Sequence, residues 1–135
     1  MGFRISWLLA AMLVAGCNPP ADYALVGSAF VPAVHGDITL EKIDKEHMLV
    51  VVLLDLLPPP EKVELGLTHY IVWFAAPGEN PVWQGPLDYD SEAQIGRASI
   101  PTTLRELEIM ITAESRETPN RPSDLLVASQ KIREN

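Results

Sequence analysis

Turn-forming residues divide this chain into apolar runs that are too short for most helical folds. Twelve prolines and eight glycines lie among its 135 residues. The most apolar run, Met48 to Asp55, contains three consecutive valines, whose β-branched side chains lose rotamer freedom in a helix. Three prolines after Leu57 must end this run, because proline has no backbone N–H to donate to a sheet. Both features predict a buried central strand at Met48–Asp55.

The same alternation of apolar runs and turn residues continues along the rest of the chain. The second strong strand is expected at His69–Ala75, where aromatic and β-branched residues dominate. A turn is expected at His35–Asp37, and the polar segment Glu114–Asp124 is expected to be a solvated loop. Further strands are expected at Ala24–Val34, Ile38–Ile43, Val82–Tyr89, Gln94–Ile100, Leu107–Ala113 and Leu125–Ile132. Seven to eight short strands at this spacing predict an all-β fold, an antiparallel immunoglobulin-like β-sandwich.

Alternation within the runs predicts which side chains form the core, because successive residues of a strand point to opposite faces. Burial of each such side chain contributes about 1.5–3 kcal/mol. The alternate residues are also apolar in the Met48 and His69 runs, so the inward face of those two strands could be the opposite one. The inward set that we expect is Leu49, Val51, Leu53, Ile71, Trp73, Ile109, Ile111 and Val127.

The first 16 residues have the pattern of a cleaved secretory signal peptide. Arg4 is the only charged residue before Asp22, and Ile5 to Ala15 is apolar apart from one serine. This apolar stretch of about 11 residues is shorter than the roughly 20 residues that span a bilayer as a helix. The pattern predicts export, with cleavage between Gly16 and Cys17. A short uncleaved anchor, or an ordinary signal with an incidental cysteine, is the competing interpretation.

The segment Leu13-Val14-Ala15-Gly16-Cys17 resembles the lipobox of bacterial lipoproteins, and Cys17 is the only cysteine in the chain. The resemblance implies lipidation of Cys17 on its sulfur and nitrogen, and attachment to a membrane through that lipid. Asn18 is not the acidic residue that often retains lipoproteins at the inner membrane, so the implied address is the outer membrane, facing the periplasm. The predicted organisation is a signal peptide at 1–16, a lipidated tether at 17–22 and the sandwich domain at 23–135.

An acidic surplus limits the partners of the mature domain. The chain has 18 Asp and Glu against ten Lys and Arg, a formal charge of −8. Such a surface opposes binding to nucleic acid, which needs clustered cations to neutralise phosphates, and it opposes docking on anionic lipid. We therefore expect no nucleic-acid partner, and membrane attachment through the lipid alone.

The sequence contains no motif that indicates catalysis, a metal or a cofactor. Its serines lie outside any Gly-x-Ser-x-Gly elbow, and its three histidines lack the paired spacing of zinc ligands. Asp88, Asp90 and Glu92 alternate near a turn, and carboxylates of this kind are calcium ligands. A solvated hairpin turn is the favoured interpretation of these acids, with calcium as the alternative. We expect a non-enzymatic protein without a cofactor.

Scattered motifs lie between Leu57 and Ile132. They are the prolines after Leu57, a Tyr-x-x-Trp strand at Tyr70–Trp73, a Pro-x-x-x-Gly-x-Leu segment at Pro81–Leu87, a strand at Ile109–Glu114, and Pro122, Leu126 and Ser129. Together they resemble the extracytoplasmic C-terminal domain of anti-sigma-K-type factors. The resemblance implies a β-sandwich. It does not imply anti-sigma activity, which in that family belongs to a cytoplasmic helical domain joined through a membrane helix, and we expect neither in this sequence.

An anchor and a β-scaffold without a chemical motif favour a binding function. We expect a protein or an envelope component as partner, because loops at the ends of sandwiches commonly carry binding residues. The expected contact residues are Trp83, Asn80 and Glu79, since tryptophan is frequent in interface hot spots. Packing at the rim of the core is the competing interpretation of Trp83. The alternative function is a structural spacer, or a carrier with an apolar cavity of several hundred cubic ångströms.

Overall fold

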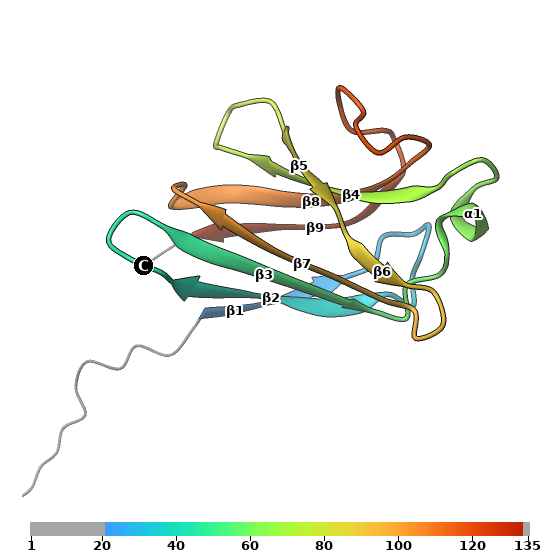
Figure 1. The fold of residues 1–135 in the computed structure, drawn as a ribbon, viewed down its shortest axis with the longest axis horizontal. Helices are drawn as coiled ribbons and strands as arrows, with labels where there is room; N and C mark the ends of the chain where they lie inside the picture. The colour runs from blue at the N-terminus through green and yellow to red at the C-terminus, as the bar shows by residue number, and fades with distance from the viewer. Residues whose placement is uncertain (1–20, 134–135) are drawn as a thin grey trace, which may run out of the picture.

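The computed structural model describes residues 21–133, which form two antiparallel sheets packed face to face (Figure 1). One sheet has the strand order β1-β2-β3-β7-β6 and the other has the order β5-β4-β8-β9. The strands of the first sheet are β1 (Ala21–Val26), β2 (His35–Lys42), β3 (Met48–Asp55), β7 (Ile95–Thr102) and β6 (Asp88–Asp90). The strands of the second are β5 (Val82–Pro86), β4 (His69–Ala75), β8 (Glu106–Glu114) and β9 (Leu126–Arg133). The single described helix, α1 (Pro60–Val63), lies between β3 and β4.

The strand order is that of an immunoglobulin-like sandwich. Strands β2-β3-β7-β6 follow the order A-B-E-D, and β4-β8-β9 follow the order C-F-G. Strand β5 extends the second sheet beside β4, and β1 adds an edge strand beside β2. The predicted all-β, antiparallel immunoglobulin-like sandwich is therefore confirmed, with nine strands in the described residues where seven to eight were expected.

One of the additional strands arises because the expected run Val82–Tyr89 is divided between the two sheets. Strand β5 pairs with β4, whereas β6 pairs with β7 in the opposite sheet. Gly85 has a φ of +127°, a conformation that side-chain-bearing residues rarely adopt, and Pro86 follows it. Leu87 is buried between the two strands, and its backbone N–H donates to the carbonyl of Tyr70 at 2.8 Å. The chain thus crosses the core at Leu87.

The core is formed by the opposite side of β3 and β4 from the expected one. Every second residue of β3 from Met48 is buried, while the outward residues are half-buried. On β4, Tyr70, Val72 and Phe74 belong to the core cluster. The expected inward set was therefore wrong for Leu49, Val51, Leu53, Ile71 and Trp73, and right for Ile109, Ile111 and Val127. Both sides of β3 and β4 are apolar, so alternation alone could not assign their inward face.

Several boundaries also differ from the sequence-based expectation, and the strand expected at Ala24–Val34 ends at Val26, after which the chain turns before β2. Strand β1 begins at Ala21, inside the segment that was assigned to the tether. His35–Asp37 is not a turn, because it pairs with the end of β3 as part of β2. A Cβ atom on Gly36 would lie 1.9 Å from the carbonyl oxygen of Leu53. Gly36, which was expected as a turn residue, instead allows two strand backbones to approach closely.

Two tyrosines hold the proline segment that ends β3. The Tyr89 hydroxyl donates to the carbonyl of Leu57 at 2.5 Å, and the Tyr70 hydroxyl donates to the carbonyl of Pro58. Their rings meet edge to face with centroids 5.6 Å apart. Tyrosine hydroxyls are protonated donors at neutral pH, and burial raises the pKa of these two further.

We expect Tyr70→Phe to lower the free energy of unfolding by about 1–2 kcal/mol, because it removes one hydrogen bond and leaves the Pro58 carbonyl without that donor. Urea unfolding of the two proteins measures the difference. Tyr23→Phe is the matched control, since the Tyr23 hydroxyl donates to an exposed carbonyl, that of Arg133. An equal effect of the two substitutions would contradict a stabilising role of the Tyr70 hydroxyl.

Candidate functional site

The predicted contact residues Glu79 and Asn80 lie at the end of the sandwich where β1 begins. They belong to the loop 76–81 between β4 and β5, and both are exposed. A turn shapes this loop: the Glu79 N–H donates to the carbonyl of Ala76 at 2.9 Å, and Gly78 has a φ of +74°. Strand β1 begins and β9 ends at the same end of the molecule (Figure 1).

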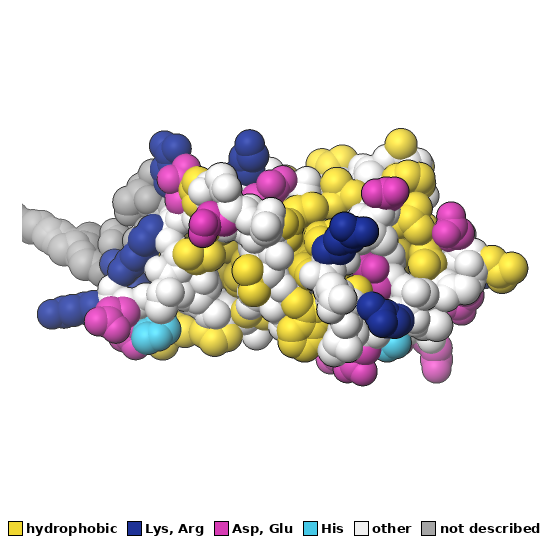
Figure 2. All heavy atoms as spheres, turned by 90° about the horizontal axis from the view of Figure 1, so that it is seen from above, with side chains coloured by type: hydrophobic (Ala, Val, Ile, Leu, Met, Phe, Trp, Pro, Cys, Tyr) yellow, Lys and Arg dark blue, Asp and Glu magenta, His cyan; other side chains and the backbone are white. Residues whose placement is uncertain are grey.

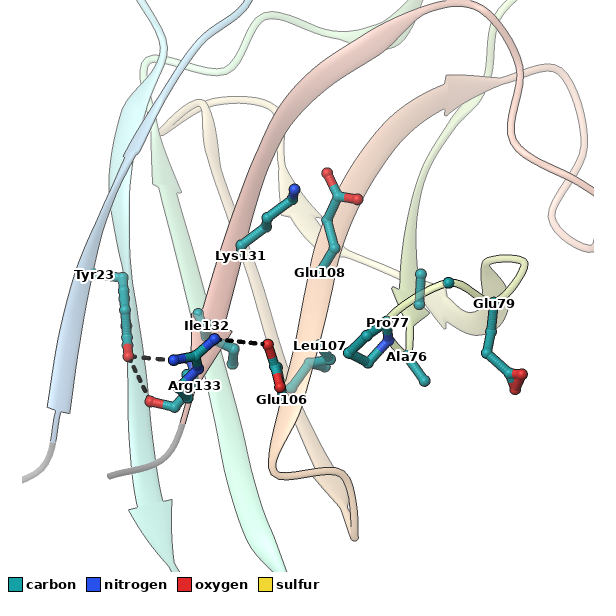
Figure 3. A pocket seen from close by; sticks show the side chains of 12 residues that line it. Tyr23, Ala76, Pro77, Glu79, Glu106, Leu107, Glu108, Lys131, Ile132 and Arg133 are labelled. Atoms are coloured by element: carbon teal, nitrogen blue, oxygen red, sulfur yellow. Dashed lines mark hydrogen bonds and ion pairs between the residues drawn. The ribbon is translucent and has the colours of Figure 1, made fainter.

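A groove of about 570 Å³ opens between this loop and the ends of β8 and β9 (Figure 3). Apolar groups from Ala75, Leu107 and Ile132 line it. Charged groups surround them: Arg133 pairs with Glu106 at 3.1 Å, in an exposed ion pair of small energetic weight. The remaining lining residues are Tyr23, Ala76, Pro77, Gly78, Glu79, Glu108 and Lys131. The volume suits a ligand, and the mixed lining suits a polar or peptidic one.

A second groove, of about 510 Å³, lies on the other side of the same loop. It runs between β5 and the end of β7, where Phe74 contributes an apolar wall. Glu79 lines both grooves, and Asn80 lines the second. The further lining residues are Ala76, Val82, Gln84, Thr102 and Leu104. The structure therefore brings two of the three predicted contact residues to the border between two grooves.

Trp83 lies apart from these grooves, on the outer face of the second sheet. It pairs with Trp73 across β5 and β4, and 39% of its surface is exposed. Its indole N–H donates to the carbonyl of Glu117 at 2.9 Å. Val82, its neighbour, is 60% exposed. Figure 2, seen from this side, shows hydrophobic side chains in patches separated by polar and charged groups. Trp83 thus packs at a rim and still exposes part of its ring.

A buried polar network holds the β8–β9 loop over the outer face of the second sheet (Figure 1). Trp73 is fully buried there, and its indole N–H donates to the Thr112 hydroxyl at 2.8 Å. That hydroxyl donates to the Glu114 carboxylate at 2.6 Å, and the Ser123 N–H donates to the same oxygen at 2.8 Å. The expectation of a solvated loop is wrong for Glu114, which is 6% exposed. The Glu114 carboxylate thus accepts hydrogen bonds from Thr112 and Ser123, so the network stabilises the fold.

The acidic turn at Asp88–Glu92 is organised by its own backbone. One oxygen of Asp90 accepts hydrogen bonds from the N–H groups of Glu92 and Ala93 at 3.0 and 3.2 Å. Among residues 21–133, no group of three or more His, Cys, Asp or Glu side chains is placed to hold a metal ion. The turn therefore has the geometry of a side-chain-capped turn.

The fold defines the chain as an immunoglobulin-like β-sandwich domain. No family model, no curated protein and no solved structure matches this chain. The resemblance to anti-sigma-K-type factors consequently stays a prediction. The predicted cleavage between Gly16 and Cys17, and the lipidation of Cys17, fall outside the described residues. Within residues 21–133, no helix has the length and apolarity required to cross a bilayer.

Proposed function

We propose that this chain is an exported lipoprotein, tethered to a membrane through lipid on Cys17, whose sandwich domain binds a protein or another envelope component without catalysis. The observation that carries the proposal is the position of Ala21, the first residue of β1. Ala21 is four positions after Cys17, and four extended residue steps span about 14 Å at most. A lipid on Cys17 would therefore hold the sandwich close to the bilayer.

This tether gives the domain an orientation. The end that carries Tyr23, the loop 76–81 and Arg133 faces the membrane, because β1 begins there. The loops 27–34, 56–68 and 91–94 lie at the opposite end and point away from it. A partner that contacts Glu79 and Asn80 is then a molecule located at the membrane surface.

The grooves beside Glu79 favour a binding function over the carriage of an apolar ligand. Five of the twelve residues that line the larger groove have charged side chains. Burying an acyl chain against carboxylate and ammonium groups would desolvate those charges without giving them partners. An extended polypeptide, by contrast, supplies N–H and C=O groups to pair with them. The structural-spacer alternative requires no contact at Glu79 or Asn80, which separates it from a binding function.

Site-specific photocrosslinking in intact cells tests the proposal. A photoreactive amino acid at position 79 or 80 is expected to form one discrete adduct, identified by mass spectrometry. The same residue at Glu92 is the matched control, because Glu92 is an exposed acid of the turn 91–94 at the opposite end. Adducts of equal amount at all three positions, or no adduct at 79 and 80, would refute the proposed contact and favour the spacer.

A further inference from the structure

The two outer faces of the sandwich differ in how the described chain covers them. On the second sheet, the outward side chains of Trp73 and Thr112 have no exposed surface, and the β8–β9 loop is bound to this face through Ser123 and Glu117. On the first sheet, the outward residues Leu49, Val51 and Leu53 are all partly exposed. Nothing in residues 21–133 covers this central strand on its outer side, so its apolar groups face solvent.

These three side chains form a continuous apolar stripe on β3, whose register fixes its neighbours. Val51 pairs with Thr39 on β2 and with Ser99 on β7. The stripe continues beyond Leu49 to Pro101, its partner on β7. From Leu49 to Leu53 the stripe measures about 13 Å along the strand. Outward positions of a sandwich are usually polar, so a central strand with three outward apolar residues is a candidate docking surface.

Carboxylates flank the stripe on its β2 side, whereas on the β7 side Arg97 is the partner of Leu53 and the acids Asp88 and Asp90 lie one strand further, on β6. On β2, Glu41 and Asp37 are the cross-strand partners of Leu49 and Leu53. Among the described residues that face outward on the strands of this sheet, Arg97 is the one permanent cation. The acidic residues of this face are Asp22, Asp37, Glu41, Asp55, Asp88 and Asp90. The face therefore combines an apolar centre with a negative rim.

We propose that this face docks a cationic amphipathic helix of a partner protein, with apolar side chains on Leu49, Val51 and Leu53 and lysines or arginines over the carboxylate rim. Apolar residues at i, i+4 and i+7 of a helix span about 11 Å, which matches the stripe. The negative rim is complementary to a cationic partner. It repels a second copy of this face, anionic lipid and nucleic acid. This surface lies apart from the loop 76–81 and does not depend on the lipid anchor.

A pair of synthetic peptides about four turns long tests this inference. One has leucine on one helical face and lysine on the other, and the second replaces each lysine by glutamate. The full chain is presented in phosphatidylcholine nanodiscs, with empty nanodiscs as the blank. The lysine peptide is expected to bind at least tenfold more tightly than the glutamate peptide. Its affinity is expected to fall severalfold between roughly 0.05 and 0.5 M salt, because salt screens exposed charges.

Variants of the chain locate the binding surface. Val51→Lys, at the centre of the stripe, is expected to weaken binding of the lysine peptide at least tenfold. Ser129→Lys is the matched control, since it adds the same charge on the opposite sheet and is expected to leave binding unchanged within twofold. Asp37→Asn with Glu41→Gln tests the rim without disturbing the packing, and a severalfold loss of affinity is expected.

Four results would overturn the inference. The first is equal binding of the two peptides, and the second is an equal effect of Val51→Lys and Ser129→Lys. The third is unchanged affinity in the Asp37→Asn, Glu41→Gln variant. The fourth is self-association of the chain that Val51→Lys abolishes, which would assign the face to a second copy. Crosslinking at Glu79 is an independent measurement, so failure here leaves the proposed function separately testable.

Discussion

Replacing Cys17 by serine is expected to transfer the protein almost completely from the membrane fraction to the soluble extracytoplasmic fraction. Each buried methylene group contributes about 0.8 kcal/mol to membrane binding, so several acyl chains hold a protein firmly. The acidic domain offers anionic lipid no electrostatic attraction to replace them. Cell fractionation, with radiolabelled palmitate and intact-mass measurement of the purified protein, follows the change.

The Cys17 experiment has a matched control at the next position. Asn18→Asp introduces the acidic residue that often retains lipoproteins at the inner membrane. The variant is therefore expected to keep its lipid but to fractionate with the inner membrane instead of the outer membrane. No disulfide is lost in Cys17→Ser, because the chain has one cysteine. Recovery of the unmodified wild-type protein from the cytoplasm, with its first 16 residues intact, would refute the lipoprotein proposal.

Thr112→Val is expected to lower the free energy of unfolding by about 2–4 kcal/mol, although valine has nearly the shape of threonine. The Thr112 hydroxyl is fully buried and links the Trp73 indole to the Glu114 carboxylate. Its removal leaves a buried N–H without its acceptor and a buried carboxylate without its shortest hydrogen bond. Urea unfolding followed by tryptophan fluorescence measures the loss.

A double-mutant cycle separates the network from the packing of its members. Trp73→Phe and Thr112→Val share one hydrogen bond, so we expect a coupling free energy above about 0.5 kcal/mol. Thr39→Val is the matched control: the Thr39 hydroxyl also donates to a carboxylate, that of Asp22, at an exposed position. We expect it to cost less than about 0.5 kcal/mol. Equal losses for Thr112→Val and Thr39→Val would contradict the role of the buried network.

The strands that the sequence locates best are those with strong local signals at both ends. Met48–Asp55 and His69–Ala75 begin and end in the structure at the predicted residues. Consecutive β-branched and aromatic residues favour a strand there, and prolines close to the end of each run cannot continue a ladder. Such signals act within a few residues, so they can be read without knowledge of the tertiary fold.

The features that the sequence did not predict all depend on contacts between distant segments. At Leu87 the chain passes from one sheet to the other, because the Leu87 N–H donates to the carbonyl of Tyr70 and its side chain enters the core. Trp73 is buried on the outer side of its sheet, where its indole bonds to Thr112 and where the Ser123–Glu114 hydrogen bond holds the loop 115–125, far along the chain. Local alternation treats either side of β4 as a possible core face, so it could not make this distinction.

The same limit applies to the candidate site. The sequence predicted Glu79 and Asn80 as contact residues, and the structure places both, exposed, in the loop 76–81. The grooves beside the loop are completed by Tyr23 and Arg133 on one side and by Thr102 on the other. No spacing in the sequence relates these residues, because β-sandwich connections bring together segments that are far apart along the chain.

The contact between the first and last strands has a practical consequence. The Tyr23 hydroxyl donates to the carbonyl of Arg133 at 2.8 Å, so the chain enters and leaves the sandwich at neighbouring points. A reporter fused beyond β9 would lie beside the start of β1 and crowd the groove there. A circular permutant joins the two ends and opens the hairpin at 91–94. A reporter fused to its new terminus would lie at the opposite end of the sandwich and leave that groove free.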